Sequence, residues 1–242
     1  MHPQFIYTGP SWALRSYDPP GSQEDNIRTN LAKEWQIPFL DLACRGVGVL
    51  NGVSAVESVA DQLPIVWIYN EPIIDLTAIT GLSFAEFIQR SDWKDIWKEC
   101  NQHCLQSINK IGKPVLLIGA HSDIVDCKYD NIIVGHHSWQ KWIAKEAGLQ
   151  VDDDAVYVKM DDGGDFSFEH CWGAEIVHRL MHEHPEIVPS TEIVNAIWDI
   201  FFFWKELEKA KLFYEVHPNH RANVEFAKFL LPTINKFLQD NK

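Results

Sequence analysis

A serine and a histidine near opposite ends of the chain are the residues best suited to nucleophilic chemistry. Ser11 follows a short apolar run, and His217 stands in a His-Pro-Asn sequence just before the last apolar-periodic segment. A serine hydroxyl is a weak nucleophile unless a base takes its proton and hydrogen-bond donors stabilise the oxyanion that forms. An imidazole titrates near neutral pH and is the most frequent base. Ser11 and His217 are therefore a candidate nucleophile and base that only folding can bring together.

Two other loops contain candidate donors for the oxyanion. Gly46 or Gly48 could present a backbone N–H, because glycine lets the main chain approach a ligand closely, and Asn70 could add its side-chain amide. Each residue also has a plain structural interpretation. Serine is a preferred helix N-cap, glycines make tight turns, and an asparagine can cap its own loop. The order of these residues along the chain is what favours the catalytic interpretation.

Short apolar runs predict the strands that would position these residues. The runs are typical of strands buried in a parallel sheet, and they cover 4–8, 39–44, 64–69, 114–119 and 155–160. Apolar residues at spacings of three and four predict helices between them, most clearly over 92–111 and 220–238. This alternation predicts one domain with a three-layer α/β/α fold around a five-stranded parallel sheet. Ligands of such folds bind beyond the carboxyl ends of the strands, where the loops with Ser11, Gly48 and Asn70 would meet.

Four short motifs, in this order, resemble the sequence blocks of the SGNH (GDSL-type) hydrolases. They are Gly9-Pro10-Ser11, Gly46-Val47-Gly48, Ile68-Tyr69-Asn70-Glu71 and Tyr214-Glu215-Val216-His217-Pro218. The resemblance implies a flavodoxin-like fold and a serine esterase that works through an acyl-enzyme without a metal or cofactor. It implies Ser11 as nucleophile, His217 as base, and an oxyanion hole made by Ser11 N–H, Gly48 N–H and the Asn70 amide. The substrate it implies is a small-molecule or carbohydrate ester, with an O-acetylated carbohydrate as the first choice.

One departure from the family pattern bears directly on activity. Tyr214 stands where the family has the acid that orients the histidine. Loss of that acid from a triad can lower turnover by about 10⁴. Glu215 or Asp123 could take over the role, or a backbone carbonyl could hold the ring of His217. The alternative is a catalytically inactive protein of the same fold with a binding or structural role. A nucleotide- or flavin-binding protein ranks last, because no glycine-rich phosphate loop follows the first run.

The composition argues against several other classes of protein. The 242 residues have a formal net charge of −13, which repels nucleic acids and anionic membrane surfaces. No apolar run approaches the roughly 18 residues that a membrane span needs. The five cysteines are irregularly spaced and no secretory signal is recognisable, so a cytoplasmic location is expected.

Two further features stand outside the catalytic set. His178 and His182 have the i, i+4 spacing of metal ligands on a helix, but no third ligand is identifiable, so a solvated helix face is expected. The segment 161–212 is not explained by the family and predicts a helical elaboration. Its run from Trp198 to Trp204 is apolar nearly all round, so we expect core packing together with a homodimer contact to cover it.

Overall fold

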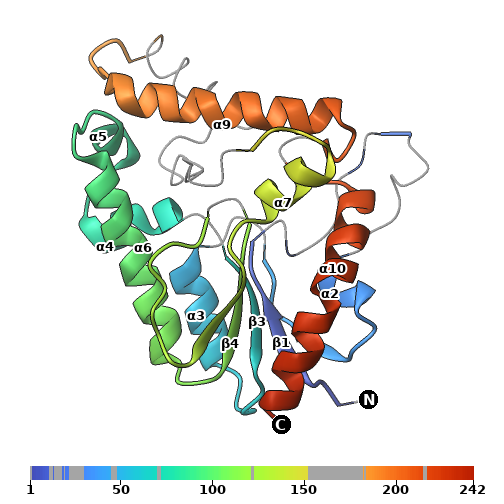
Figure 1. Cartoon of the computed structure of the whole chain (residues 1–242). Helices are drawn as coiled ribbons and strands as arrows, with labels where there is room; N and C mark the ends of the chain where they lie inside the picture. Colours follow the sequence, from blue (N-terminus) through green and yellow to red (C-terminus); the bar gives the residue numbers. More distant parts are fainter. Residues whose placement is uncertain are drawn as a thin grey trace.

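The computed structural model describes residues 2–10, 13, 18, 20–21, 30–44, 48–69, 72–120, 123–151, 182, 184–214 and 217–242, apart from the side chains at 197, 200–204 and 214. Five parallel strands form its centre, in the order β2-β1-β3-β4-β5 (Figure 1). They are β1 (Phe5–Thr8), β2 (Phe39–Asp41), β3 (Ile65–Tyr69), β4 (Val115–Gly119) and β5 (Ile132–His136). This is the flavodoxin-like strand order, and it confirms the predicted α/β fold class.

The fifth strand is a correction to the sequence prediction. We expected it at 155–160, which lies outside the described residues, whereas the strand that pairs with β4 is Ile132–His136. Its apolar run is only three residues long before Gly135, which is shorter than a typical buried strand. As an edge strand it is also less covered, and Ile133 is 48% exposed. The other four strands lie within their predicted ranges.

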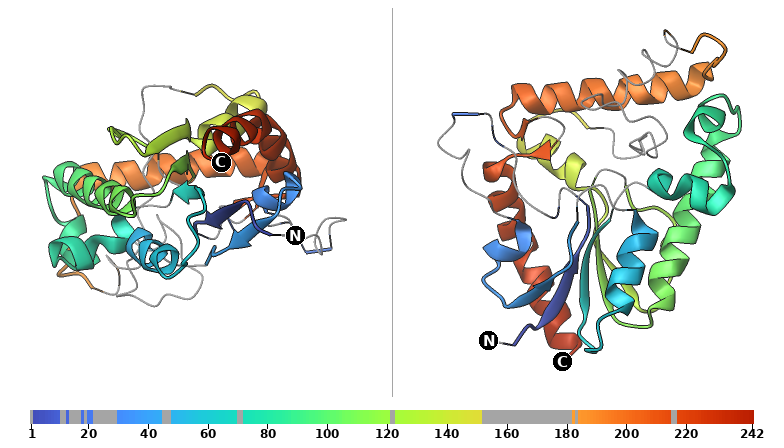
Figure 2. Two further views of the ribbon diagram at one scale, coloured as in Figure 1. Left: turned by 90° about the horizontal axis from the view of Figure 1, so that it is seen from below. Right: turned by 180° about the vertical axis from the view of Figure 1, so that it is seen from behind.

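Helices cover both faces of the sheet and form three layers with it (Figures 1 and 2). One face packs against α3 (Val49–Glu57) and α6 (Trp93–Lys110). The other packs against α2 (Leu31–Glu34), α7 (Trp139–Glu146) and α10 (His220–Asp240). The helices predicted over 92–111 and 220–238 are thereby confirmed as α6 and α10.

Strand residues alternate between the two faces, as the period of two requires. On β1, Phe5 and Tyr7 belong to the core under α10, while Ile6 belongs to the core under α3 and α6. Every residue of β3 and β4 is buried. The central strands are therefore buried on both faces, which explains their continuous apolar runs.

A third apolar cluster forms where short helices meet α6. These helices are η1 (Pro72–Asp75), α4 (Leu76–Thr80) and α5 (Phe84–Ile88). The long helix α9 (Thr191–Lys209) joins this cluster through the fully buried Ile193 and joins the core under α10 through Leu207. α9 lies beyond the carboxyl ends of the strands (Figures 1 and 2). It confirms a helix within the predicted elaboration 161–212, of which 161–181 lie outside the described residues.

None of the helices in the described part of the chain combines the length and the apolar character needed to cross a bilayer.

Candidate functional site

The carboxyl end of β1 presents the first predicted block. Gly9 has φ +146°, and a Cβ there would lie 2.6 Å from Ile68 O and 3.0 Å from the Cβ of Ala13. Only glycine therefore fits between β3 and the chain that follows β1. Ala13 N–H donates a hydrogen bond to Pro10 O at 2.9 Å, and Ala13 is fully buried. Ser11 stands between Pro10 and Ala13 in the sequence and lies outside the described residues.

Gly48 is the N-cap residue of α3, and its side-chain position is occupied by the carboxyl group of Asp75. Asp75 Oδ2 accepts hydrogen bonds from Val49 N–H at 2.6 Å and Leu50 N–H at 3.4 Å. A Cβ on Gly48 would lie 2.7 Å from Asp75 Cγ. Glycine at this position thus lets a distant carboxyl group cap the helix. Gly46, the other candidate of this loop, lies outside the described residues.

The surroundings of Asp75 make it an unusual carboxyl group. Asp75 is only 7% exposed, and this burial raises the pKa of its carboxyl group. Hydrogen bonds from Leu50 N–H, Val49 N–H and the Cys104 thiol partly oppose the shift. The Cys104 Sγ lies 3.7 Å from Asp75 Oδ2. Burial also raises the pKa of Cys104, so this thiol stays protonated and donates.

Asp75 was not among the residues selected from the sequence. The available signal was an acidic residue within the otherwise apolar segment Pro72–Leu76, directly after a strand and its loop. Such a residue is either solvated or has a specific buried partner.

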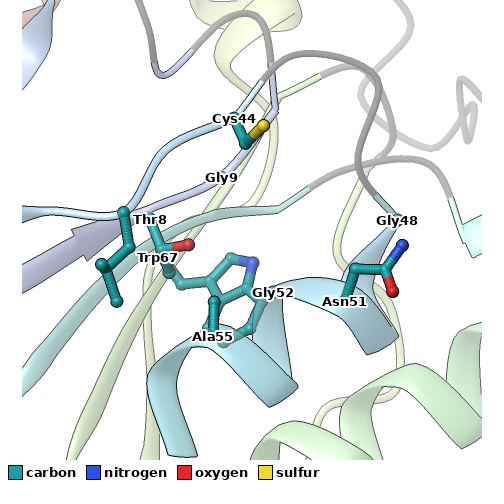
Figure 3. A pocket seen from close by; sticks show the side chains of 9 residues that line it. Thr8, Gly9, Cys44, Gly48, Asn51, Gly52, Ala55 and Trp67 are labelled. Carbon is teal, nitrogen blue, oxygen red and sulfur yellow. The ribbon is translucent and has the colours of Figure 1, made fainter. Parts of the chain in front are cut away.

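A small recess lies between the end of β1 and the first turns of α3 (Figure 3). Its volume is about 40 Å³. The lining residues that matter here are Thr8, Gly9, Gly48, Gly52, Ala55 and Trp67. The Trp67 ring lies against Gly52, since a Cβ there would be 2.8 Å from Cζ2. Two residues of the predicted blocks, Gly9 and Gly48, therefore line the same recess.

His217 is held in a short two-stranded ribbon just before α10. β7 (His217–Pro218) pairs antiparallel with β6 (Phe213–Tyr214), so Tyr214 lies opposite His217. His217 is 4% exposed. Asn219 caps α10, because its Oδ1 accepts from Ala222 N–H at 3.0 Å, and its own N–H donates to Leu212 O at 3.0 Å. The His-Pro-Asn sequence thus fixes the start of the last helix.

The chain after the first block contacts the start of the helix that follows the histidine block. His220 N–H points to the carboxylate of Asp18, with distances of 3.2 and 3.3 Å to its two oxygens. Ala13 belongs to the same core cluster as Phe213 and Ala222, which flank His217 in sequence. Folding therefore brings the segments on either side of Ser11 and His217 to the same face of the sheet.

The group that orients His217 is not fixed by the described contacts. Glu215 lies outside the described residues, as does Asn70, the third predicted oxyanion donor. Asp123, which follows β4, is 3% exposed and forms an ion pair with Lys141 at 3.0 Å. This ion pair gives Asp123 a structural role. Whether Glu215, Asp123 or a carbonyl orients the ring stays a prediction.

The histidines considered as metal ligands have ordinary surroundings where they are described. His182 is exposed, while His178 lies outside the described residues. Within the described ranges no three His, Cys, Asp or Glu side chains gather in a way that could hold a metal ion.

Fold and site together define a parallel α/β protein with its candidate site at the carboxyl ends of β1, β2 and β3. No protein-family model matches the sequence, and the comparison with curated proteins found no match. Among solved structures, the crystal structure of the protein YxiM from Bacillus subtilis is similar, with a TM-score of 0.41 and 12% sequence identity. The match covers 97% of this chain, which spans 57% of the length of that protein.

Proposed function

We propose that this protein is a serine esterase, which hydrolyses a carboxylic ester through an acyl-enzyme with Ser11 as nucleophile and His217 as base. The observation that supports the proposal is the contact of Asp18, seven residues after Ser11, with the backbone N–H of His220, three residues after His217. The resemblance of the four motifs to the SGNH hydrolases supports the same assignment. An O-acetylated carbohydrate is the substrate class to screen first.

The proposed reaction has two balanced steps. Ser11 Oγ attacks the ester carbonyl carbon while His217 takes its proton and passes it to the departing alcohol, which leaves an acyl-enzyme. Water then attacks the acyl group, and His217 takes the proton of the water and returns it to Ser11. In both steps the negative charge develops on the carbonyl oxygen. The proposed donors to that oxygen are Ser11 N–H, Gly48 N–H and the Asn70 amide.

The burial of His217 favours a role in which its ring is held in one orientation. A general base must stay within hydrogen-bond reach of the proton that it takes. At 4% exposure, with a paired strand before it and a capped helix after it, His217 has little freedom to move. This rigidity would partly compensate for the missing family acid at position 214.

The test is the intact mass of the protein after incubation with a fluorophosphonate, which reacts with activated serines. We expect one adduct on the wild type and none on Ser11→Ala or His217→Ala. Two matched controls should keep the adduct: Ser54→Ala on the exposed side of α3, and His103→Ala on the exposed side of α6. All variants are checked for folding by circular dichroism.

The absence of an adduct on folded wild-type protein would contradict the proposal. The alternative, an inactive protein of the same fold that binds a ligand, would then take its place. An adduct that survives Ser11→Ala would place the nucleophile on another serine.

A further inference from the structure

The peptide group between Gly48 and Val49 is hydrogen-bonded at both of its ends. Val49 N–H donates to Asp75 Oδ2 at 2.6 Å, and Gly48 O accepts from Gly52 N–H at 3.2 Å. A peptide group is planar, so bonds at its N–H and its C=O fix the orientation of the whole plane. This plane adjoins a glycine, which rotates more freely about its backbone bonds than other residues. Asp75 therefore restrains the backbone of Gly48, which lines the recess at the end of β1 (Figure 3).

Asp75 is itself held by the segment that leads out of β3 and by α6. It is the last residue of η1, whose first two residues are also buried. The Cys104 thiol of α6 donates to Asp75 Oδ2, with 3.7 Å between the sulfur and the oxygen. Three residues earlier on α6, Asn101 Oδ1 accepts from the hydroxyl group of Tyr69 at 2.8 Å. Helix α6 thus holds the chain on both sides of Asn70, another of the predicted oxyanion donors.

The carboxyl group of Asp75 thereby connects the two loops that contain predicted oxyanion donors. Gly48 stands in the loop after β2, and Asn70 follows β3 directly. Donors stabilise an oxyanion only if they are in place before the charge develops. A displacement of about 1 Å can lower the rate roughly 10²-fold. The contact between Asp75 and the start of α3 is therefore of the kind that an oxyanion hole built from two loops requires.

We propose that Asp75 is a positioning residue, whose carboxyl group holds Gly48 N–H in the place from which it donates to the carbonyl oxygen of the substrate. This inference rests on the proposed esterase function. Asp75 acts here as a hydrogen-bond acceptor and not through its charge, because a negative charge near an oxyanion raises the energy of the oxyanion. An uncharged acceptor of the same shape is therefore expected to serve in its place.

The experiment compares Asp75→Asn, which retains an acceptor of the same shape, with Asp75→Leu, which retains the shape without an acceptor. Asp75→Ala replaces Asp75→Leu should that variant not fold. Each protein is assayed with 4-nitrophenyl acetate and with its thiono analogue, whose C=S sulfur is a weak hydrogen-bond acceptor. The fluorophosphonate adduct counts the active sites. A loss of folded protein lowers both rates equally, whereas a misplaced donor lowers mainly the rate for the oxygen ester.

We expect Asp75→Leu to lower kcat for 4-nitrophenyl acetate by about 10²-fold per active site, with KM nearly unchanged. The ratio of kcat/KM for the oxygen ester to that for the thiono ester should fall roughly tenfold or more. Asp75→Asn should stay close to the wild type in both quantities. The matched control is Ser83→Ala, which removes the N-cap of α5, where Ser83 Oγ accepts from Glu86 N–H at 3.2 Å. It should leave the ratio unchanged.

The outcomes separate this inference from the esterase proposal. An unchanged ratio in Asp75→Leu overturns the inference, while turnover by the wild type still supports the esterase. A fall of equal size in Asp75→Asn also overturns it, because a hydrogen-bond acceptor at this place would then not be sufficient. A fall of equal size in Ser83→Ala overturns it as well, since the loss of any helix cap would then have the same effect. Wild-type protein without adduct or turnover overturns the esterase and this inference together.

Discussion

Gly48 and Asp75 form a pair in which one residue is small so that the other can be buried. The Asp75 carboxyl group caps α3 from outside the helix and occupies the space that a Gly48 side chain would need. We expect Gly48→Ala to lower the free energy of unfolding by roughly 1–3 kcal/mol, because the carboxyl group must move away from the Val49 N–H. Urea unfolding measures this change.

A double-mutant cycle identifies the cause. In an Asp75→Ala background the clash is absent, so Gly48→Ala should cost clearly less than in the wild type. If Gly48→Ala costs the same in both backgrounds, contact with Asp75 does not explain the glycine.

His136 makes the stability depend on pH. Burial, with contributions from His137 and Lys145, lowers the pKa of His136 to about 4. The ring packs edge-on against Phe226 and Phe229, and its Nδ1 accepts from Ser138 N–H at 3.2 Å, which only the neutral ring can do. Below about pH 6.5 the unfolded chain takes up a proton that the folded protein refuses, so stability falls between pH 6.5 and 4.

We therefore expect His136→Gln, which can still accept from Ser138, to weaken this acid sensitivity. As the pH falls, the free energy of unfolding of the wild type should decrease more than that of the variant, by about 3 kcal/mol at most. Urea unfolding at several pH values between 7 and 4 checks it. Parallel curves for the two proteins would show that His136 does not cause the acid sensitivity.

At the scale of elements, the short helix α2 is fixed to the long helix α10 by one buried hydrogen bond. Trp35 Nε1–H, directly after α2, donates to Ala227 O at 3.0 Å. Its ring also packs against Phe5 and Tyr7 of β1. Trp35→Phe keeps an aromatic ring but removes the donor, and we expect a loss of about 0.5–1.5 kcal/mol in the free energy of unfolding, measured by urea unfolding. An unchanged stability would show that the bond to Ala227 contributes nothing net.

The strength of a sequence pattern decided which elements could be predicted. β1, β3 and β4 are buried on both faces and stand out as continuous apolar runs, and α6 and α10 each show a long apolar stripe. β5 could not be predicted in the same way, because an edge strand needs fewer apolar residues.

The candidate site was predictable only in part. Gly48 was selected by its order after a predicted strand and His217 by its place before the last helix, and the structure shows Gly48 as the N-cap residue of α3 and His217 in the strand before α10. Asp75 could not be selected by spacing, because its role depends on which side chain fills the space of a glycine. Such a role arises from packing and produces no residue pattern that can be recognised in the sequence.

At the scale of the whole molecule, α9 is anchored at two separate places. Ile193 and Leu207 are both fully buried but belong to different apolar clusters, and they are about 20 Å apart along the helix. We expect Ile193→Ala and Leu207→Ala each to cost roughly 2–5 kcal/mol and the double variant to cost their sum. Urea unfolding of the three variants tests this expectation. If the double variant is as stable as the less stable of the two single variants, α9 detaches as one unit.

The position of α10 has a consequence for how the protein emerges from the ribosome. The five strands of the parallel sheet precede residue 137, yet the helix that covers Tyr7 and much of that sheet face begins only at His220. A nascent chain can thus complete its sheet while one apolar face still lacks its main cover. Until the residues of α10 arrive, this face is open to chaperones and to premature association with neighbouring chains.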